Sequence, residues 1–197
     1  MTNTKNKPSI ILASSSPRRR DLLRQIGVDF IVDPADVNES ILTGELPEDY
    51  AVRVSLDKAR VAARKAGEGI VIAADTIVVF KEVILGKPVD THDAKRMLEM
   101  LSGKMHKVVT GLTVMNAATE MVSSKISTTK VWFRDLDEDE VWKYVLSKEP
   151  MDKAGAYGIQ GKGALLVARI EGCYYNVVGL PLALLDEMLR KFGIKLL

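Results

Sequence analysis

The sequence predicts an α/β fold in which a mixed, twisted sheet is flanked by helices. Short apolar runs that suit strands alternate along the chain with segments of helical periodicity, and this alternation is typical of that class. The run from 69 to 79 is apolar almost throughout, as expected of a strand that is covered on both faces. No internal repeat or linker divides the 197 residues, so we expect one domain spanning 1–197 with a substantial core.

The first half of the chain carries clear signals for the ends of its elements. Ser16 followed by Pro17 is a strong helix start, with serine as the N-cap and proline at the first helical position. Gly27 and Gly67 follow helical segments, where glycine is common. The predicted elements are strand 10–13, helix 17–25, strand 30–32, a polar turn-rich segment 33–46, a helix from Pro47 to Gly67, and strand 69–79.

In the second half, apolar spacing and capping residues mark the helices. Thr91 is the expected N-cap of a helix that ends at Gly103. Asp137 with Glu140 forms a capping-box pattern at the start of a helix that ends near Lys148. The other predicted elements are strand 107–115, a long β-branched strand 121–134, a glycine-rich segment 155–163, strand 164–170, and a last helix from Pro181.

The composition argues against several classes of partner. A net charge of +2, from 28 basic and 26 acidic residues, is too balanced to indicate a nucleic-acid or membrane partner. The one cysteine, Cys173, fits a reducing compartment. The first nine residues are polar and carry no secretory signal, and no apolar run is long enough to span a membrane. We therefore expect a cytoplasmic protein without nucleic-acid or membrane partners.

The segment Ser14-Ser15-Ser16-Pro17-Arg18-Arg19-Arg20 predicts a site for phosphate groups. A helix N-terminus offers unsatisfied N–H groups and the positive end of the helix dipole, and both attract anions. Arginines in the same turn add forked donors that match phosphate oxygens. The alternative is a capped helix with a solvated basic face, and this segment alone does not decide between the two.

Two acidic positions are candidates for metal binding or proton transfer. Asp75 interrupts the apolar run 69–79, and a carboxylate is costly there unless it is paired, binds a metal or lies at an exposed end. It is either a general base or a metal ligand, with an aspartate paired in the core as the alternative. Glu39 lies in an acidic loop with Asp33 and Asp36, and together with Asp75 it could supply oxygen ligands for Mg²⁺.

Two lysines and a glutamine complete the candidates. Lys58 on the second helix and Lys87 in the turn Gly86-Lys87-Pro88 suit phosphate oxygens as point charges, or are simple surface lysines. Gln160 lies in the glycine-rich segment, and its amide matches the carbonyl and ring N–H edge of uracil or thymine. The absence of a Gly-x-x-x-x-Gly-Lys-Ser/Thr run argues against a P-loop enzyme.

Four of these motifs together resemble the Maf family of nucleoside triphosphate pyrophosphatases, historically called septum formation inhibitors. They are Ala13 to Arg19, Ala74 to Thr76, Gly86 to Pro88, and Lys153 to Gly161, in order and at family-like spacing. The resemblance implies a fold related to inosine-triphosphate pyrophosphatases, with two lobes around a cleft. It also implies cleavage between the α- and β-phosphates, which releases a nucleoside monophosphate and pyrophosphate.

The resemblance implies residue roles as well. It makes Asp75 the catalytic proton acceptor and implies a divalent cation, Mg²⁺ or Mn²⁺, held by Glu39 and Asp75. The resemblance assigns base selection to Arg18, Thr76 and Gln160. It assigns phosphate binding to Ser14, Arg18, Arg19, Lys58 and Lys87.

The run Gly-Ala-Tyr-Gly-Ile-Gln-Gly at 155–161 is similar to the branch of the family that hydrolyses dTTP and UTP. A homodimer is also implied by the resemblance. Two rival interpretations stay open at this point. One is a nucleotide-binding regulator of cell division that needs no turnover, and the other is an inosine-triphosphate-type pyrophosphatase that prefers purines.

Overall fold

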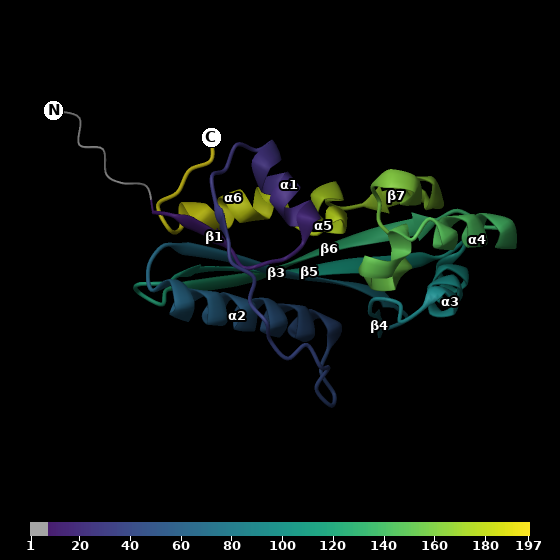
Figure 1. Cartoon of the computed structure of the whole chain (residues 1–197), viewed down its shortest axis with the longest axis horizontal. Coiled ribbons are helices and arrows are strands. Elements are labelled where there is room, and N and C mark those ends of the chain that lie inside the picture. The colour runs from purple at the N-terminus through teal and green to yellow at the C-terminus, as the bar shows by residue number, and fades with distance from the viewer. Residues whose placement is uncertain (1–7) are drawn as a thin grey trace.

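The computed structural model describes residues 8–197, and residues 1–7, part of the segment in which we expect no secretory signal, lie outside them. The described residues form a seven-stranded sheet with the order β2-β1-β3-β5-β6-β7, and β4 pairs with β3 beside that path. β1 runs parallel to β2 and β3, whereas β3, β5, β6 and β7 are successively antiparallel. The predicted α/β class with a mixed sheet is therefore confirmed (Figure 1).

The element bounds follow the predicted alternation closely. The strands are β1 (Ile10–Leu12), β2 (Ile31–Val32), β3 (Ile70–Phe80), β4 (Val83–Leu85), β5 (Met105–Asn116), β6 (Val122–Phe133) and β7 (Val167–Glu171). The α-helices are α1 (Pro17–Gln25), α2 (Pro47–Ala66), α3 (Thr91–Leu101), α4 (Glu138–Leu146), α5 (Tyr174–Val178) and α6 (Leu182–Arg190). Short 3₁₀ segments cover Glu149–Asp152, Ala154–Ala156 and Gly161–Leu166. None of the described helices is both long and apolar enough to cross a membrane.

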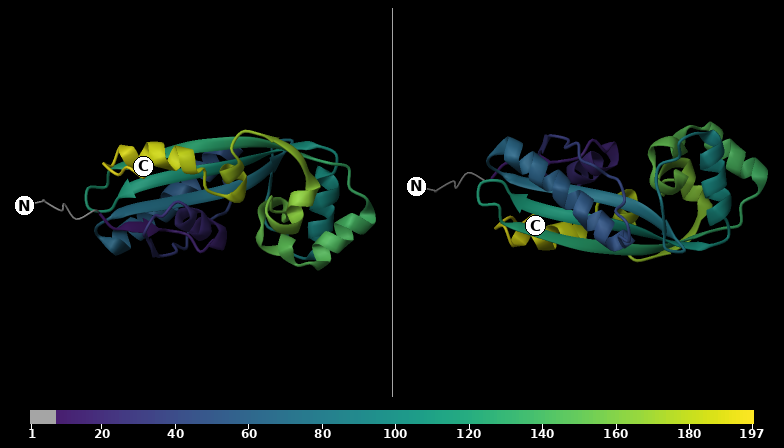
Figure 2. Two further views of the ribbon diagram at one scale, coloured as in Figure 1. Left: turned by 90° about the horizontal axis from the view of Figure 1, so that it is seen from above. Right: turned by 90° about the horizontal axis from the view of Figure 1, so that it is seen from below.

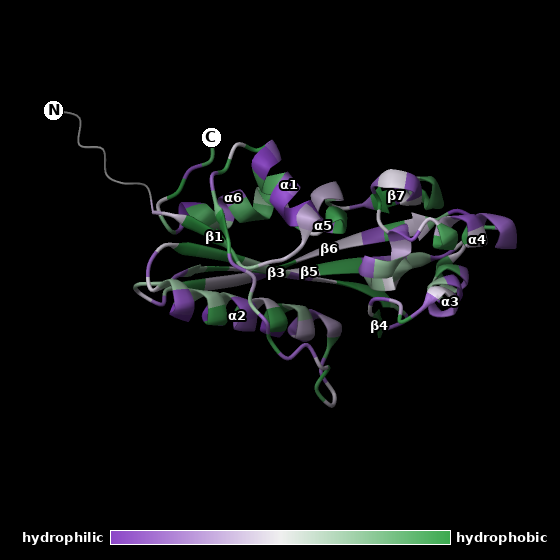
Figure 3. Ribbon diagram, in the orientation of Figure 1, coloured by the Kyte–Doolittle hydropathy of each residue, from purple (hydrophilic) through white to green (hydrophobic). Residues whose placement is uncertain are grey.

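Helices cover both faces of the sheet. α2 packs on one face through small residues such as Ala59 and Ala63, which meet Val71 and Ala73 of β3. α1, α5 and α6 cover the other face, over a core that includes Leu23, Ile72 and Leu185. Figure 3 shows the hydrophobic residues concentrated on the strands and on the helix faces turned toward them.

A smaller group of elements lies at the far end of the long strands. It consists of β4, α3, α4 and the segment 149–166, and we call it the small lobe; the remaining elements form the large lobe (Figure 2). The small lobe has its own core, in which Leu98, Phe133 and Tyr144 are buried. Because β3, β5 and β6 extend through both groups, the sheet itself joins the two lobes.

Several local predictions are wrong. Asp90, not Thr91, is the N-cap of α3, and its carboxylate accepts a hydrogen bond from the Asp93 N–H at 2.7 Å. The last strand begins at Val167 rather than at 164, because residues 161–166 wind into a 3₁₀ segment first. β4 and α5 were not expected from the sequence. The predicted capping box of Asp137 and Glu140 is confirmed.

The edge of β3 is left without a neighbouring strand over its middle. β5 pairs with one edge of β3. On the other edge, β1 pairs with residues 70–72 of β3 and β4 pairs with residues 78–80. Between them lies the stretch 73–77, which includes Asp75 and Thr76. Successive side chains of a strand point to opposite faces, so Asp75 faces α2 and Thr76 faces α1. Asp75, predicted to take part in catalysis, and Thr76, predicted to select the base, therefore lie at the same gap in the sheet.

Candidate active site

The serine-rich turn connects β1 to α1 beside this gap. The Ala13 N–H donates to the Ile72 carbonyl at 2.9 Å, which ties the start of the turn to β3. Ser14 Oγ then accepts from the Ser16 N–H at 3.2 Å. Ser16 occupies the N-cap position as predicted, but within the described residues its side chain makes no capping hydrogen bond. The hydroxyl that organises this turn therefore belongs to Ser14.

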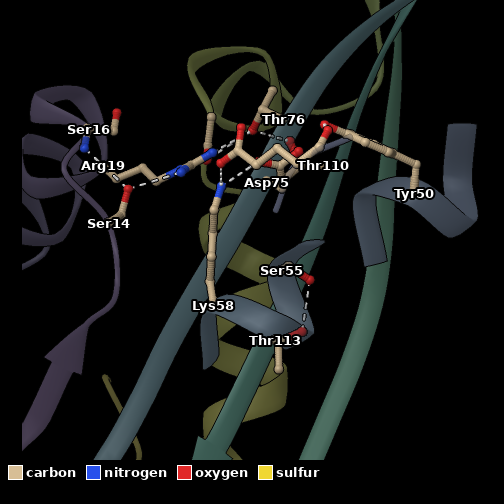
Figure 4. A network of polar contacts seen from close by, with 12 residues as sticks. Ser14, Ser16, Arg19, Tyr50, Ser55, Lys58, Asp75, Thr76, Thr110 and Thr113 are labelled. Carbon is tan, nitrogen blue, oxygen red and sulfur yellow. Dashed lines mark hydrogen bonds and ion pairs between the residues drawn. The ribbon is translucent and has the colours of Figure 1, made fainter. Parts of the chain in front are cut away.

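Arg19 is buried between α1, β3 and the turn after α5. Its Nε donates to the Gly179 carbonyl at 2.8 Å, and its terminal nitrogens donate to Ser14 Oγ and Thr76 Oγ1, each at 3.0 Å (Figure 4). Burial lowers the pKa of Arg19, and the negative charge of Asp75 opposes this effect. A guanidinium carries five N–H donors, so about two remain for another acceptor. Arg19 thus fixes the turn and keeps positive charge at the gap.

Lys58 joins the two predicted acidic residues. Its Nζ lies 2.7 Å from Asp75 Oδ1 and 2.7 Å from Glu39 Oε1. Its side chain is only 11% exposed, as is that of Asp75, so most of this interaction is shielded from water. Charged groups in such a place need partners, and here each one has its counter-charge. Figure 4 shows Lys58 reaching up from α2 to Asp75 on the strand.

A glycine opposite Asp75 allows α2 to come this close to the sheet. Gly111 of β5 is the cross-strand partner of Asp75. A methyl group added at Gly111 would lie 2.1 Å from the Ala51 carbonyl oxygen of α2, far inside van der Waals contact. Only a residue without a side chain fits between strand and helix at this point. The short distance from Lys58 to Asp75 depends on this close approach.

The loop that carries Glu39 is held against α2 by two side chains. The Tyr50 hydroxyl donates to the Glu39 carbonyl at 2.9 Å. Burial, with added effect from the charges of Asp75 and Glu39, raises the pKa of Tyr50 to about 12, so the hydroxyl keeps its proton. Arg53 donates to the Ser40 carbonyl and makes two hydrogen bonds to the Glu45 carboxylate, which lower the pKa of Glu45 to about 2.

Thr76 belongs to a buried chain of hydroxyls on the other sheet face. Its Oγ1 lies 2.9 Å from Thr110 Oγ1, and Thr110 in turn donates to the Asn176 carbonyl at 3.4 Å. The Asn176 amide donates to the Val108 carbonyl and to Thr129 Oγ1, each at 3.0 Å. The position of Thr76 is therefore fixed from β5 and α5 as well as from Arg19.

Arg18 links the two lobes. Its NH1 donates to Asp152 Oδ2 at 2.9 Å, so a residue of α1 is paired with a residue of the small lobe. Burial raises the pKa of Asp152, but hydrogen bonds from Lys153 and Arg18 outweigh it, and the net pKa is lowered. Lys87 and Gln160 line the same space from the small lobe. Within residues 8–197 neither of their side chains has a hydrogen-bond or ion-pair partner.

These residues surround a single cleft of about 910 Å³ between the lobes. Each of the predicted site residues lines it: Ser14, Arg18, Arg19, Glu39, Lys58, Asp75, Thr76, Lys87 and Gln160. Arg18 and Asp75 thus open onto the same space, as a shared polyphosphate site requires. Of the other acidic loop residues, Asp36 lines the cleft, whereas Asp33 is ion-paired with Lys65.

Sequence reasoning missed several cleft residues. Tyr50, Glu149 and Asp152 line the cleft but belong to no recognisable motif. The one available signal is the pair of acids in Glu149-Pro150-Met151-Asp152, directly before the glycine-rich segment. An acid beside a segment of small residues predicts little by itself, since most such acids are solvated. His106 is buried against Tyr157 and Phe133 in the small-lobe core.

The carboxylates fit a divalent cation that also binds phosphate. Asp75 and Glu39 point oxygens at one position, the Lys58 ammonium, and carboxylate oxygens are the ligands that Mg²⁺ and Mn²⁺ prefer. No cluster of three or more metal-ligating residues occurs among the described residues. Mg²⁺ commonly takes one or two carboxylates together with substrate phosphates and water, and the donor set found here matches that pattern.

The fold and the cleft together define an α/β protein with a cation-lined cleft, suited to a polyphosphate, at a gap in its sheet. Among solved structures, the chain is similar to a HAM1 protein from Coxiella burnetii, with a TM-score of 0.54 and 16% identity. That match covers 93% of this chain and 99% of the other, and it shows a shared fold.

The sequence comparison is more specific. The chain belongs to the family described as Maf-like protein, whose family model matches residues 9–192. It is 50% identical to a dTTP/UTP pyrophosphatase of Carboxydothermus hydrogenoformans, over 93% of this chain and 98% of the relative. It is 48% identical to a dTTP/UTP pyrophosphatase of Acetivibrio thermocellus, over 95% and 97%. The same name is carried by a relative from Methanosarcina mazei, 45% identical over 94% of each chain.

Proposed function

We propose that this chain is a nucleoside triphosphate pyrophosphatase that hydrolyses dTTP and UTP to the monophosphate and pyrophosphate. Relatives at about half identity over nearly their full length carry that name. The single observation that carries the proposal from the site is the meeting of Arg18, Lys58 and Lys87 with Asp75 and Glu39 in one cleft. Pure anion binding needs the cations alone, whereas hydrolysis also needs a group that orients water.

The cations bind the phosphate chain. Attack by water on the α-phosphorus breaks its bond to the bridging oxygen, and negative charge develops on the departing pyrophosphate. Arg18, Lys58 and Lys87 line the cleft at its lobe boundary and supply fixed positive charge to those oxygens. Ser14 and Arg19 hold the turn at the start of α1, whose N–H groups add donors.

Asp75 activates the water, with Glu39 beside it. A carboxylate fixed at the middle of a buried strand can orient the attacking water and accept its proton. When bound, a divalent cation would polarise a phosphoryl oxygen and lower the pKa of a coordinated water, and Glu39 and Asp75 would hold it. Lys58, which pairs with both carboxylates, keeps them close together in the free protein.

Gln160 and Thr76 select the base. The Gln160 side chain is exposed in the cleft and its amide can pair with the carbonyl and N–H edge of thymine or uracil. Thr76, held by Thr110, and Arg18 border the same space. The expected cytoplasmic location, the homodimer and the lack of nucleic-acid and membrane partners stay predictions.

A panel of nucleoside triphosphates, scored for released pyrophosphate with and without a chelator, tests this function. We expect turnover of dTTP and UTP well above that of GTP, ATP and inosine triphosphate, and its loss on chelation. Preference for inosine triphosphate would identify the purine-type enzyme instead. Tight nucleotide binding without any pyrophosphate release would favour the regulatory alternative.

A further inference from the structure

The loop that presents Gln160 is held by a carboxylate and a phenol to which the proposed mechanism gives no role. The loop, Gly158 to Gly163, follows the second 3₁₀ segment of the small lobe and includes the start of the third. Gln160, the residue proposed to select the base, lines the cleft from this loop and is exposed. A side chain on such a loop can select a base only if the backbone beneath it is fixed.

Glu149 fixes the end of the loop that follows Gln160. Its Oε2 accepts from the Lys162 N–H and its Oε1 from the Gly163 N–H, both at 3.1 Å. These are N–H groups of the first turn of the 3₁₀ segment, so the carboxylate of a distant residue serves as its cap. Hydrogen bonds to an ionised acceptor are stronger than those between neutral groups.

Tyr144 fixes the end that precedes Gln160. Its hydroxyl donates to Glu149 Oε1 at 3.0 Å and accepts from the Gly158 N–H at 3.2 Å. The ring is buried in the small-lobe core, and burial raises the pKa of the hydroxyl, which therefore keeps the proton that it donates. The two side chains together hold backbone N–H groups on both sides of Gln160.

Two glycines of the loop lie too close to their neighbours to carry a side chain. A methyl group added at Gly163 would lie 2.0 Å from the Gly158 carbonyl oxygen and 2.7 Å from the Tyr144 hydroxyl. One added at Gly161 would lie 2.8 Å from Glu149 Oε2. The glycines thus allow the backbone to pack against Glu149 and Tyr144, which is a steric reason for the glycine-rich sequence.

We propose that Glu149 and Tyr144 are positioning residues that determine base selectivity by fixing the Gly158–Gly163 loop, and with it Gln160, against the pyrimidine edge. The inference rests on the proposed function. Neither residue is assigned to the phosphates or to the attacking water, so its loss should weaken recognition of the base and leave phosphate binding intact.

The test compares Glu149→Gln with the unaltered full-length chain. Glutamine is close in shape, but its amide can supply only one accepting oxygen, so one loop N–H must face an N–H₂ group. We expect KM for dTTP to rise roughly tenfold with kcat changed less than about threefold, and the ratio of kcat/KM for dTTP over GTP to fall roughly tenfold. Inhibition by pyrophosphate, which has no base, should stay within about twofold.

Three further variants make the test specific. Tyr144→Phe keeps the ring and removes both hydrogen bonds, so it should lower the same ratio, and it decides the matter if Glu149→Gln fails to fold. Gln160→Ala combined with Glu149→Gln should lose no more selectivity than Gln160→Ala alone, because both act through one side chain. Glu138→Gln, an exposed acid of the same lobe paired with Lys95, is the matched control and should change nothing.

The outcomes separate this inference from the proposed function. An unchanged dTTP-to-GTP ratio in a folded Glu149→Gln or Tyr144→Phe protein would overturn the role of the pair. So would an equal loss of pyrophosphate inhibition, which indicates a general disturbance of the cleft. If the unaltered chain releases no pyrophosphate from any nucleotide, the proposed function fails, and the same ratio is then measured as Kd values by calorimetry.

Discussion

The two walls of the cleft are held in different ways. On the large-lobe wall, Lys58 and Asp75 lie on α2 and β3, a long helix and a long strand that pack directly on each other. On the small-lobe wall, Gln160 lies on a loop that depends on a few hydrogen bonds from Glu149 and Tyr144. A helix and a strand that pack together are held by many contacts, whereas a single substitution can change the conformation of a loop that is held by few. The arrangement places Asp75 and Lys58 on the rigid wall and Gln160 on the adaptable one.

On the rigid wall, Asp75→Asn is the substitution with the largest expected effect on activity. The amide cannot accept a proton from water, so we expect kcat to fall by about 10³-fold or more while the fold persists. Pyrophosphate release gives kcat, and a thermal melt checks that the protein is folded. Near-normal turnover by the folded variant would remove Asp75 from the mechanism.

The adaptable wall is probed most directly by Gln160→Ala. Removing the amide should abolish most of the discrimination between UTP and GTP, a change of roughly ten- to a hundredfold in the ratio of their kcat/KM values. The effect should lie in selectivity and leave unfolding unaltered, since the side chain is exposed. An unchanged ratio would count against pairing between this amide and the base.

Gly111→Ala tests whether the rigid wall depends on the approach of α2 to the sheet. The added methyl group overlaps the Ala51 carbonyl, so α2 must move and carry Lys58 away from Asp75. We expect a loss of about 1–3 kcal/mol in the free energy of unfolding and a fall of about tenfold in kcat. Gly27→Ala, where an added methyl group meets no atom within 4 Å, is the glycine control. It should lose stability because of its positive φ and keep its kcat.

The last expected effect concerns acid stability, and it belongs to the small lobe alone. Burial lowers the pKa of His106 to about 4, whereas an unfolded histidine titrates near its ordinary value of 6.5. Between these values the unfolded chain binds more protons, so stability is lost as the pH falls through that window, by up to about 3 kcal/mol. Above pH 6.5 this contribution is fully present.

Urea unfolding of the chain and of His106→Phe, at pH 7 and at pH 4.5, measures this contribution. The variant loses the hydrogen bond to Tyr157 at pH 7 but has no group to titrate, so its deficit should shrink in acid. A deficit that is the same at both pH values would show that His106 is not the group responsible.

The sequence predicted the parts of the molecule that local chemistry controls. Three signals set the end of a helix through local contacts: Ser16-Pro17 at the start of α1, the capping box at the start of α4, and Gly67 at the C-terminus of α2. The structure has all three helix ends at these positions. β4 could not be predicted, because three residues form a strand here only through pairing with β3. The 3₁₀ segment at 161–166 depends on Glu149, a partner that local pattern does not reveal.

The residues of the site could be predicted from the sequence, whereas the contacts between them could not. The resemblance to the family assigns Asp75, Lys58 and Gln160 to one predicted site, and all of them line the cleft. The pairing of Arg18 with Asp152 depends on how the lobes meet. The position of Lys58 between two carboxylates depends on how α2, β3 and the loop before α2 pack together. No local pattern encodes such contacts, because their partners are far apart in the sequence.

The alternation along β3 has a consequence for the accuracy of folding. Asp75 and Thr76 are neighbours in the chain, yet they serve opposite faces of one strand. A slip of one residue in strand pairing would exchange them, aiming the hydroxyl at Lys58 and the acid at Arg19. The uninterrupted ladder from Ile70–Asn116 to Val79–Lys107 makes such a slip costly. The length of the β3–β5 pairing therefore safeguards the orientation of two functional groups.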